Sequence, residues 1–335
     1  MLTKLEASNY RSLGVDVQFQ PGPLTILIGP NGSGKSNILD VLTFVRDAAR
    51  QGLPAAITNL GGIGSVRRRS FGAPYNVKIE LTMRIAGNPA SYGFELTGDK
   101  TEEYRVKSEF ALIQGQGETH NYQRAGDKWN GPQGLAPHID DQSLALNSLG
   151  GDARFKVLVD YLSMLTVYSI FPDTLRRPQK FDAARPMKRH GENWVSILRE
   201  MVNQDSKLDL LKGLNKLTGD IEDVKVSSAA GYLIAEFRQT AKNKANAKRW
   251  FEAGQQSDGT LRVAGLLTAL LQEPNLPVIG IEEPELTVHP GALPMLYDYI
   301  SNRLRPAQAR VRGPVLAVPR SHERNRAPCR VALGP

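Results

Sequence analysis

Two adjacent carboxylates close an apolar stretch toward the C-terminal end of the chain. The segment VIGIEEPELTVHP, residues 278–290, runs through small and apolar residues and then places Glu282 and Glu283 side by side. Two acids at the tip of a buried strand repel each other unless something positive lies between them. Carboxylates hold magnesium, directly or through water, and can also take a proton from an attacking water molecule. The pair therefore predicts metal-assisted hydrolysis.

A glycine-rich motif supplies the matching phosphate site. GPNGSGKS, residues 29–36, fits the pattern G-x-x-x-x-G-K-[ST] and follows the apolar strand LTILIG, residues 24–29. Its glycines let successive backbone N–H groups turn toward a phosphate, and the helix after it adds the partial positive charge of its N-terminus. The predicted ligands are ATP and Mg²⁺. The residues expected to contact the nucleotide are Gly29, Pro30, Asn31, Gly32, Ser33, Gly34, Lys35, Ser36 and Asn37.

The polar side chains of the two motifs have distinct expected roles. Lys35 reaches the β- and γ-phosphate oxygens and assists catalysis, and the Ser36 hydroxyl holds Mg²⁺. Glu282 holds the same metal through water, whereas Glu283 orients and deprotonates the attacking water. A solvated acidic turn is the alternative interpretation of the two glutamates, and the phosphate loop argues against it.

Composition indicates a globular chain in a reducing compartment. The 335 residues are 41% hydrophobic and 23% charged. No run approaches the roughly 20 apolar residues of a membrane span, and the N-terminus lacks the hydrophobic segment of a signal peptide. Cys329 is the only cysteine, so an intrachain disulfide is excluded. These features predict a cytoplasmic protein without a membrane partner.

The net charge of +8 is concentrated in the last 33 residues. Residues 303–335 contain eight Arg, no Lys and one acid, and so carry +7, which leaves +1 for residues 1–302. Two interpretations of this Arg- and Pro-rich segment stay open: an out-of-frame read of a GC-rich gene, or a basic tail that binds nucleic acid. The overall basicity is therefore weak support for a DNA-binding face on the body of the protein.

The order of elements predicts a mixed α/β fold. Strands are expected at 2–9, 14–20 and 24–29, a helix at 35–50, and an antiparallel meander at 76–85, 91–97 and 103–113. Residues 114–150 are rich in Gly and Asn and are interpreted as loops. Helices are expected at 153–166, 191–216, 258–272 and 290–303, and strands at 221–227, 231–238 and 277–282. This order indicates a parallel core interrupted by an antiparallel sheet and a helical insert.

The chain resembles ABC-type ATPases of the SMC/RecF/OLD class, in their stand-alone AAA-type branch. Four segments carry the resemblance: NYRSLGVDVQF at 9–19, IGPNGSGKSNILDVL at 28–42, SDGTLR at 257–262 and IEEPELTVHP at 281–290. The resemblance implies that Arg11 approaches the nucleotide. It also implies that Ser257 and Gly259, at a helix N-terminus, contact the γ-phosphate of ATP held by a second subunit. Simple helix capping is the alternative interpretation of Ser257.

The resemblance further implies an organisation and an assembly. The implied fold is a P-loop NTPase of ABC type with an N-terminal ATPase lobe at 1–150, a helical insert lobe at 151–217, a C-terminal ATPase lobe at 218–302 and an atypical tail at 303–335. A homodimer that closes around two ATP molecules is implied, because neither site is complete in one chain. The class also has a glutamine that bridges Mg²⁺ and water, and a switch histidine. The candidates are Gln179 and His322, while His289 is interpreted as structural or near the dimer interface.

Proteins similar by these motifs act in DNA repair, chromosome maintenance and phage defence, often beside a nuclease. The resemblance therefore implies an ATP-hydrolysing head with DNA, and a partner nuclease or toxin, as candidate partners. The alternative is a regulatory or scaffold module that acts on a partner protein without DNA. The basic clusters at 66–70 and 242–249 would separate the two, although each is also interpretable as solvated surface. A GTPase or small-molecule kinase is disfavoured, because no Asn-Lys-x-Asp stretch is present.

Overall fold

The chain divides into two compact units. The structure, a computed structural model, describes residues 1–69, 76–115, 117–137, 139–203, 205–239, 249–287, 293–304, 315–319 and 330–333. Unit 1 comprises Met1–Thr166 with Ser321–Leu333, and unit 2 comprises Val167–Arg320 with Gly334–Pro335. Within the described ranges, no helix is both long enough and apolar enough to cross a membrane.

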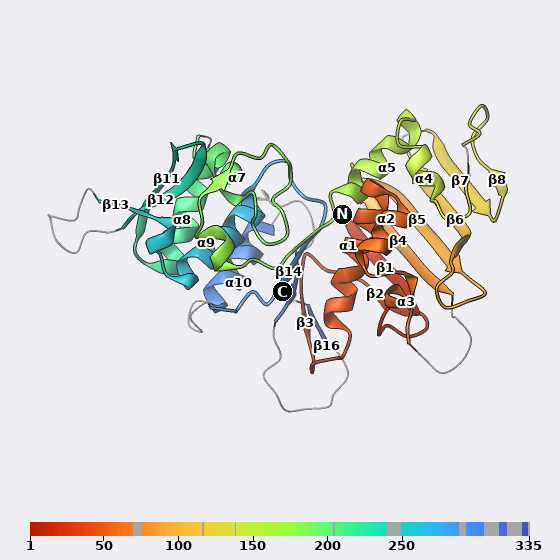
Figure 1. Ribbon diagram of the computed structural model, residues 1–335, viewed down its shortest axis with the longest axis horizontal. Coiled ribbons are helices and arrows are strands. Elements are labelled where there is room, and N and C mark those ends of the chain that lie inside the picture. Colours follow the sequence, from red (N-terminus) through yellow and green to blue (C-terminus); the bar gives the residue numbers. More distant parts are fainter. Residues whose placement is uncertain are drawn as a thin grey trace. The chain divides into compact units, whose positions relative to one another are not determined.

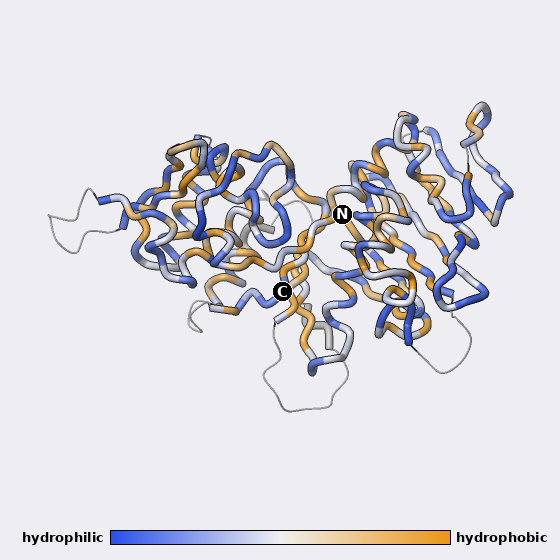
Figure 2. Tube along the Cα trace, in the orientation of Figure 1, coloured by the Kyte–Doolittle hydropathy of each residue, from blue (hydrophilic) through white to orange (hydrophobic). Residues whose placement is uncertain are grey.

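Unit 1 is built on a seven-stranded antiparallel sheet (Figure 1). The strand order is β2-β1-β4-β5-β6-β7-β8. The bounds are β1 Leu2–Ser8, β2 Val17–Phe19, β4 Val77–Ile85, β5 Asn88–Thr97, β6 Arg105–Gln114, β7 Thr119–Ala125 and β8 Lys128–Asn130. Every second residue of β4 is buried, as the alternating sequence predicts. Figure 2 shows hydrophobic and hydrophilic positions mixed along these strands, as expected for a sheet with one covered face.

Helices lie against this sheet and position the phosphate loop. Helix α1, Lys35–Gln51, packs against α2, Leu53–Asn59, and α5, Ala153–Ser163; the short helices α3, Ile63–Val66, and α4, Ala145–Ser148, complete the layer. The ring of Phe44 in α1 lies 5.7 Å from the ring of Tyr10 and 6.2 Å from that of Phe94 in β5. These aromatic contacts hold α1 on the sheet. The preceding strand β3, Leu24–Ile28, pairs antiparallel with β16, Arg330–Leu333.

A buried carboxylate fixes the start of α4. Glu109 of β6 is 1% exposed. It accepts hydrogen bonds from the hydroxyls of Tyr92 and Tyr122 at 3.1 and 2.8 Å, and from the backbone N–H groups of Ala145 and Leu146 at 2.6 and 3.0 Å. Four donors offset the cost of removing the carboxyl group from water. The network therefore anchors the N-terminus of α4 to the sheet.

The described part of unit 2 contains parallel strands, a small antiparallel sheet and five α-helices. Strands β14, Ile279–Glu282, and β15, Val315–Val318, run parallel, and β9, Thr166–Tyr168, neighbours β14. The hairpin of β11, Ile221–Ala229, and β12, Tyr232–Gln239, is extended on the β12 side by β10, Gln179–Lys180, and β13, Trp250–Glu252. The helices are α6 Pro172–Leu175, α7 Trp194–Met201, α8 Ser206–Thr218, α9 Asp258–Leu271 and α10 Leu293–Leu304.

The compact units differ from the division expected at residues 150, 217 and 302. Helix α5 packs against α1 in unit 1, whereas α7 and α8 pack against α9 and the β11–β12 hairpin in unit 2. Because the apolar faces of these helices are buried against different neighbours, the described part of 151–217 forms no lobe of its own. The mixed α/β class, with a parallel pair and an antiparallel subdomain, is confirmed.

The stretch 114–150, expected as loops, contains β7, β8 and α4. Arg124 of β7 is 2% exposed. Its guanidinium donates to the carbonyls of Gly126, Asp140 and Ser143 at 2.8, 2.7 and 2.5 Å. Arg124 is thus buried and anchors the loops that follow β7. Because arginine is usually exposed, the sequence of β7 does not show the alternation of buried and exposed residues that marks a strand.

Part of the Arg- and Pro-rich segment 303–335 is structural. All four residues of β15, which read VLAV, are buried beside β14, and residues 330–333 form β16. The atypical composition of 303–335 thus includes two strands, and the apolar run VLAV is buried where it extends a sheet. His289, His322 and Cys329 lie outside the described residues.

Candidate functional site

The phosphate loop lies between β3 and the N-terminus of α1 in unit 1. The expected nucleotide contacts, residues 29–37, form one continuous turn that leads into the helix at Lys35. Gly32 and Gly34 have φ angles of 79° and 90°, in the left-handed region that glycine adopts without strain. Gly34 has a second constraint, because a Cβ there would lie 3.2 Å from a Leu13 methyl carbon and 3.3 Å from the Ser12 hydroxyl.

The polar atoms of the loop fit a phosphate. The Lys35 ammonium donates to the carbonyls of Gly29 and Pro30 at 2.6 and 2.8 Å, so the side chain lies across the loop. The Ser33 hydroxyl is buried and has no hydrogen-bond partner among the described atoms. Ser36, in the first turn of α1, is exposed. A phosphate would give Ser33 an acceptor and Lys35 a stronger partner than a carbonyl, because charge-assisted hydrogen bonds are the stronger kind.

A turn at residues 9–14 brings Arg11 next to the loop. The turn closes through a 2.8 Å bond from the Asn9 N–H to the Gly14 carbonyl, and Asn37 donates to the Ser12 hydroxyl at 2.5 Å. Arg11 itself has a φ of 49° and ion-pairs with Asp40 of α1. The turn is therefore fastened directly to the first turns of α1, where the resemblance places a nucleotide contact.

A basic pocket of about 530 Å³ adjoins this turn. It is lined by Arg11, Ser12, Gly64, Ser65, Arg67, Arg68 and Arg69. Arg67 is 5% exposed and donates to the carbonyls of Lys100, Thr101 and Glu103 at 2.9–3.1 Å. These bonds make Arg67 a structural residue, which corrects its expected availability as a DNA contact. Arg68 and Arg69 remain exposed.

Glu282 and Glu283 lie at the end of β14 in unit 2. A backbone hydrogen bond fixes Glu283, and an ion pair fixes the side chain of Glu282. The Glu283 N–H donates to the Val318 carbonyl of β15 at 2.7 Å, which continues the parallel pairing one residue beyond β14. Glu283 then turns the chain with a φ of 48°. A non-glycine residue in this conformation needs its surroundings to impose it, and such residues concentrate at functional sites. The Glu282 carboxylate ion-pairs with Arg189 at 2.6 Å.

A buried arginine joins the acidic pair to helix α9. Arg262, which is 1% exposed, donates to the carbonyls of Glu282 and Glu283 at 3.1 and 2.5 Å. Burial lowers the pKa of Arg262, and the nearby carboxylates of Glu283 and Glu285 oppose that shift. Sequence analysis missed both Arg189 and Arg262. The signal for Arg262 was present, because it is the one charged residue between Leu261 and Leu271 of an otherwise buried helix.

The predicted signature residues begin α9. The Ser257 hydroxyl accepts the Thr260 N–H at 3.1 Å, so Ser257 is the N-cap, as the alternative interpretation expected. A Cβ on Gly259 would lie 2.9 Å from the Thr287 carbonyl, which only a shift of backbone could relieve. Gly259 therefore permits a close approach between the start of α9 and the loop after the acidic pair. Together with Arg262, it holds the two motifs as one assembly.

Gln179 does not have the expected arrangement of a metal-bridging residue. Its amide nitrogen donates to the carbonyls of Thr174 and Gly191 at 3.2 and 2.8 Å, and its carbonyl oxygen accepts the Val195 N–H at 3.0 Å. Both amide protons are used, and the residue is 8% exposed. We therefore assign Gln179 to holding its own segment together, which removes it from the predicted metal ligands.

Magnesium would be held without a cluster of protein ligands. Among the described residues, no three His, Cys, Asp or Glu side chains are grouped as a metal site. Mg²⁺ commonly keeps several waters and is bound through one or two protein oxygens and the phosphates of the substrate. Ser36 in unit 1 and Glu282 in unit 2 are suited to such a site by donor chemistry.

These features define a mixed α/β protein with a P-loop, and a comparison with protein families agrees. The sequence profile of the family described as "AAA domain, putative AbiEii toxin, Type IV TA system" matches residues 24–311. The chain belongs to this family of AAA domains, which confirms the AAA-type part of the resemblance. Among solved structures, the SMC head domain from Thermotoga maritima is similar, with 15% identity, coverage of 96% of this chain and 89% of that chain, and a TM-score of 0.46. No curated protein matches the chain.

Proposed function

We propose that the chain binds and hydrolyses ATP, and that two copies close around the nucleotides. The observation that carries the proposal is the phosphate loop. Its glycines adopt the left-handed backbone, its lysine is buried across it, and the Ser33 hydroxyl has no partner among the described atoms. Membership of the AAA domain family supports the same reading.

The residues have separate tasks in the proposed reaction. Lys35 and the loop N–H groups stabilise negative charge on the β- and γ-phosphates, and Ser36 with Glu282 would hold Mg²⁺, which neutralises phosphate charge when bound. Arg189 positions the Glu282 carboxylate at the end of β14. Glu283 takes a proton from the attacking water. Arg262 holds the carbonyls of both glutamates and so fixes the direction in which their side chains leave the strand.

The proposed dimer rests on the N-terminus of α9. The N-terminus of α9, a helix of 14 residues, carries Ser257 and Gly259 and has partial positive charge suited to a phosphate. We propose that this end of α9 meets the γ-phosphate held by the partner subunit. ATP, but not ADP, would then complete the interface.

Light scattering tests the dimer. The Glu283→Gln chain retains ATP and is expected to show a mass near twice 36.8 kDa with ATP and Mg²⁺, and the single mass with ADP. Gly259→Arg should prevent the larger mass, because it covers the end of α9 and also forces the start of α9 away from the Thr287 carbonyl, while ATP binding by the phosphate loop of unit 1 persists. A Glu283→Gln chain that binds ATP and stays monomeric at micromolar concentration would contradict the proposal.

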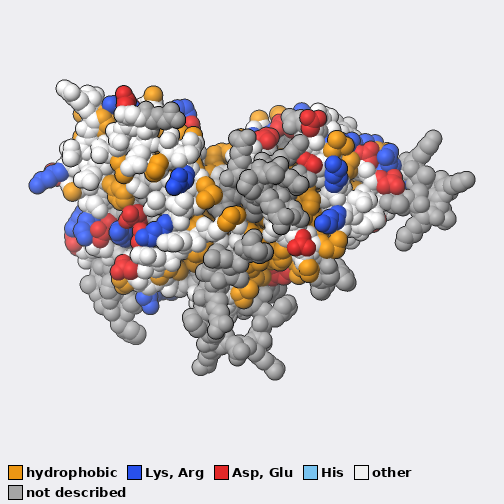
Figure 3. Space-filling view, turned by 180° about the vertical axis from the view of Figure 1, so that it is seen from behind, with side chains coloured by type: hydrophobic (Ala, Val, Ile, Leu, Met, Phe, Trp, Pro, Cys, Tyr) orange, Lys and Arg blue, Asp and Glu red, His pale blue; other side chains and the backbone are white. Residues whose placement is uncertain are grey.

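We also propose that the protein acts in phage defence and that its dimer binds duplex DNA. The family description names an AbiEii toxin and a type IV toxin–antitoxin system, and this supports phage defence, with a partner toxin, antitoxin or nuclease. Duplex DNA is the proposed ligand of the dimer, supported by the exposed Arg68 and Arg69, which line a pocket with Arg11 and Ser12. Of the second basic cluster, only Arg249 lies among the described residues. On the face drawn in Figure 3, basic and acidic side chains of the described residues are interspersed.

DNA binding is expected to depend on ATP and on these two arginines. Arg68→Glu with Arg69→Glu should lower the slope of log K against log salt by about 1.8, because each phosphate contact contributes roughly 0.9. The measurement is fluorescence anisotropy with a 30-base-pair duplex, with and without ATP. Arg84→Glu, an exposed substitution on β4, is the matched control. Binding that is unchanged in the double variant, or independent of ATP, would favour a module that acts on a protein partner.

A further inference from the structure

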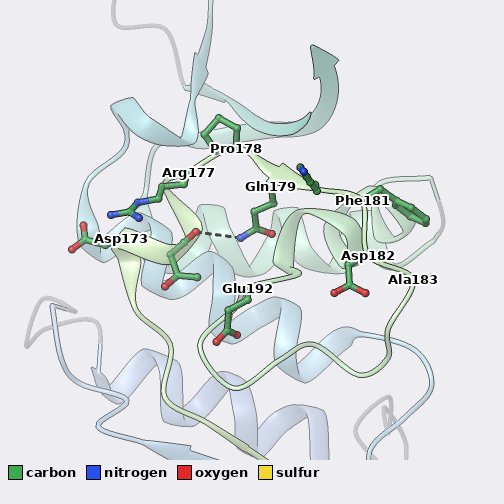
Figure 4. A pocket seen from close by; sticks show the side chains of 10 residues that line it. Asp173, Arg177, Pro178, Gln179, Phe181, Asp182, Ala183 and Glu192 are labelled. Carbon is green, nitrogen blue, oxygen red and sulfur yellow. Dashed lines mark hydrogen bonds between the residues drawn. The ribbon is translucent and has the colours of Figure 1, made fainter. Parts of the chain in front are cut away.

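A pocket of about 810 Å³ opens in unit 2, and neither glutamate of the acidic pair lines it (Figure 4). It is lined by α6, the loop after it, β10 and the turn after β10, with Glu192 opposite. Figure 4 shows Gln179 in the middle of the lining, with Arg177 on one side and Phe181 on the other. The three hydrogen bonds of Gln179 make this centre rigid. The pocket is therefore a formed feature of the fold.

The charges that line the pocket are not equally available. Asp182 ion-pairs with Lys188 at 2.7 Å and accepts the Ala184 N–H, so the pKa of Asp182 is lowered mainly by Lys188. Glu192 accepts the His190 N–H at 3.1 Å. Arg177 and Lys180, in contrast, have no ion pair or hydrogen bond of their side chains in the described part of the chain. The pocket thus offers two unengaged cations to a ligand.

The pocket also offers a strand edge and an aromatic ring. β10 pairs with β12 and makes no other backbone–backbone hydrogen bond within the described ranges. Phe181, directly after β10, is 53% exposed, with the Arg199 guanidinium 4.8 Å from its ring centre. An unpaired strand edge beside a side-chain pocket is the arrangement that accepts an extended peptide.

The same segment is tied to the start of α9. Arg176, the residue before Arg177, ion-pairs with Asp258 and donates to the carbonyls of Gly254 and Gln256 at 3.3 and 3.4 Å. Ser257 lies between these partners. A ligand that holds Arg177 and Lys180 must therefore act on the segment that positions Ser257.

We propose that this pocket binds an acidic, extended peptide segment of a partner protein, laid along the edge of β10, and that binding acts through Arg176 on the start of α9. The acidic residues of the peptide pair with Arg177 and Lys180, and an apolar residue covers Phe181. The effect on α9 rests on the proposed ATPase function, whereas the binding does not. The acids of the lining are engaged within the protein, Asp173 by Arg176, Asp182 by Lys188 and Glu192 by the His190 N–H, so Arg177 and Lys180 are the charges that a ligand meets. A nucleic acid strand is the other anionic occupant, and the experiment separates it from the peptide.

Fluorescence anisotropy with a labelled octapeptide of alternating glutamate and valine tests the site. Arg177→Ala with Lys180→Ala is expected to raise the Kd about tenfold, which corresponds to ~1.4 kcal/mol. Both side chains are exposed, so the fold should be unaffected. Lys212→Ala with Lys216→Ala removes the same charge from exposed positions of α8 and is the matched control. An octapeptide of alternating lysine and valine should bind at least tenfold more weakly than the acidic one.

Other outcomes overturn the proposal in separable ways. Equal Kd values for the double variant and the control, no measurable binding, or a 12-nucleotide DNA strand that binds more tightly than the peptide would each reject the acidic-peptide site. Binding without at least a twofold change in ATPase rate would reject the link through Arg176. The Lys35→Ala chain should bind the peptide normally, so failure of the ATPase proposal leaves the binding result intact.

Discussion

Replacing Lys35 with alanine is expected to abolish measurable ATP binding. The ammonium group lies across the phosphate loop, with two carbonyl partners in the absence of phosphate, and the side chain is 7% exposed. Its loss leaves the β- and γ-phosphates without the cation that replaces their solvation. Hydrogen bonds to charged groups are each worth about 1.5–3 kcal/mol. Two such bonds predict a loss of roughly 10² to 10⁴ in affinity, which isothermal titration calorimetry measures.

The matched comparison is Lys35→Arg, which keeps the charge. A planar guanidinium cannot enter the loop as a compact ammonium does, so this variant should also bind weakly. Circular dichroism would show whether α1 still forms in both variants. An alanine variant that folds and binds ATP as tightly as the parent would remove the phosphate-loop assignment.

The second large effect is expected from Glu283→Gln. The amide keeps the size of the carboxylate, so the 2.7 Å bond from the Glu283 N–H to Val318 and the two carbonyl contacts of Arg262 should persist. It cannot accept a proton from water. General-base catalysis typically contributes 10²- to 10⁴-fold, so kcat should fall by about this factor while the Kd for ATP changes less than threefold.

Two controls separate this role from charge alone. Glu273→Gln removes an exposed acid from unit 2 and should leave kcat within twofold of the parent. Glu282→Gln should instead raise the Mg²⁺ concentration needed for half-maximal rate, because this carboxylate is proposed to hold the metal. If Glu283→Gln keeps more than a third of the parent rate, the catalytic base lies elsewhere.

The parts predictable from sequence are those in which the chemistry is local. The glycine loop, the helix from Lys35 and the alternating strand at 77–85 depend on neighbouring residues, and each forms where the sequence indicates. The N-cap at Ser257 is local as well. The family match over residues 24–311 includes three of the four segments that carried the resemblance, and the segment at 9–19 lies outside it.

The parts that sequence analysis missed depend on partners far along the chain. Arg189 meets Glu282 across 93 residues, and Arg262 reaches the Glu282 carbonyl across 20 residues. No local pattern shows such pairings. Gln179 and Arg124 have closer partners, but these are backbone groups of loops and helix ends, which a pattern of side chains does not reveal. The division into two units was not predictable either. Helical periodicity shows that a helix has an apolar face, but it does not show which element packs against that face.

The burial of β15 has a consequence for aggregation. Val315–Val318 cover one edge of β14, whose own run Val278–Ile281 is apolar and uncharged. A chain cut at Asn302 would lose this neighbour and present an open, hydrophobic sheet edge, which is a template for pairing with other copies. In the full chain, the arginines on both sides of VLAV in the sequence act as gatekeepers, because their charge opposes aggregation of this apolar strand before it pairs with β14. The Arg-rich segment 303–335 thus contains β15, the strand that covers the aggregation-prone edge of β14.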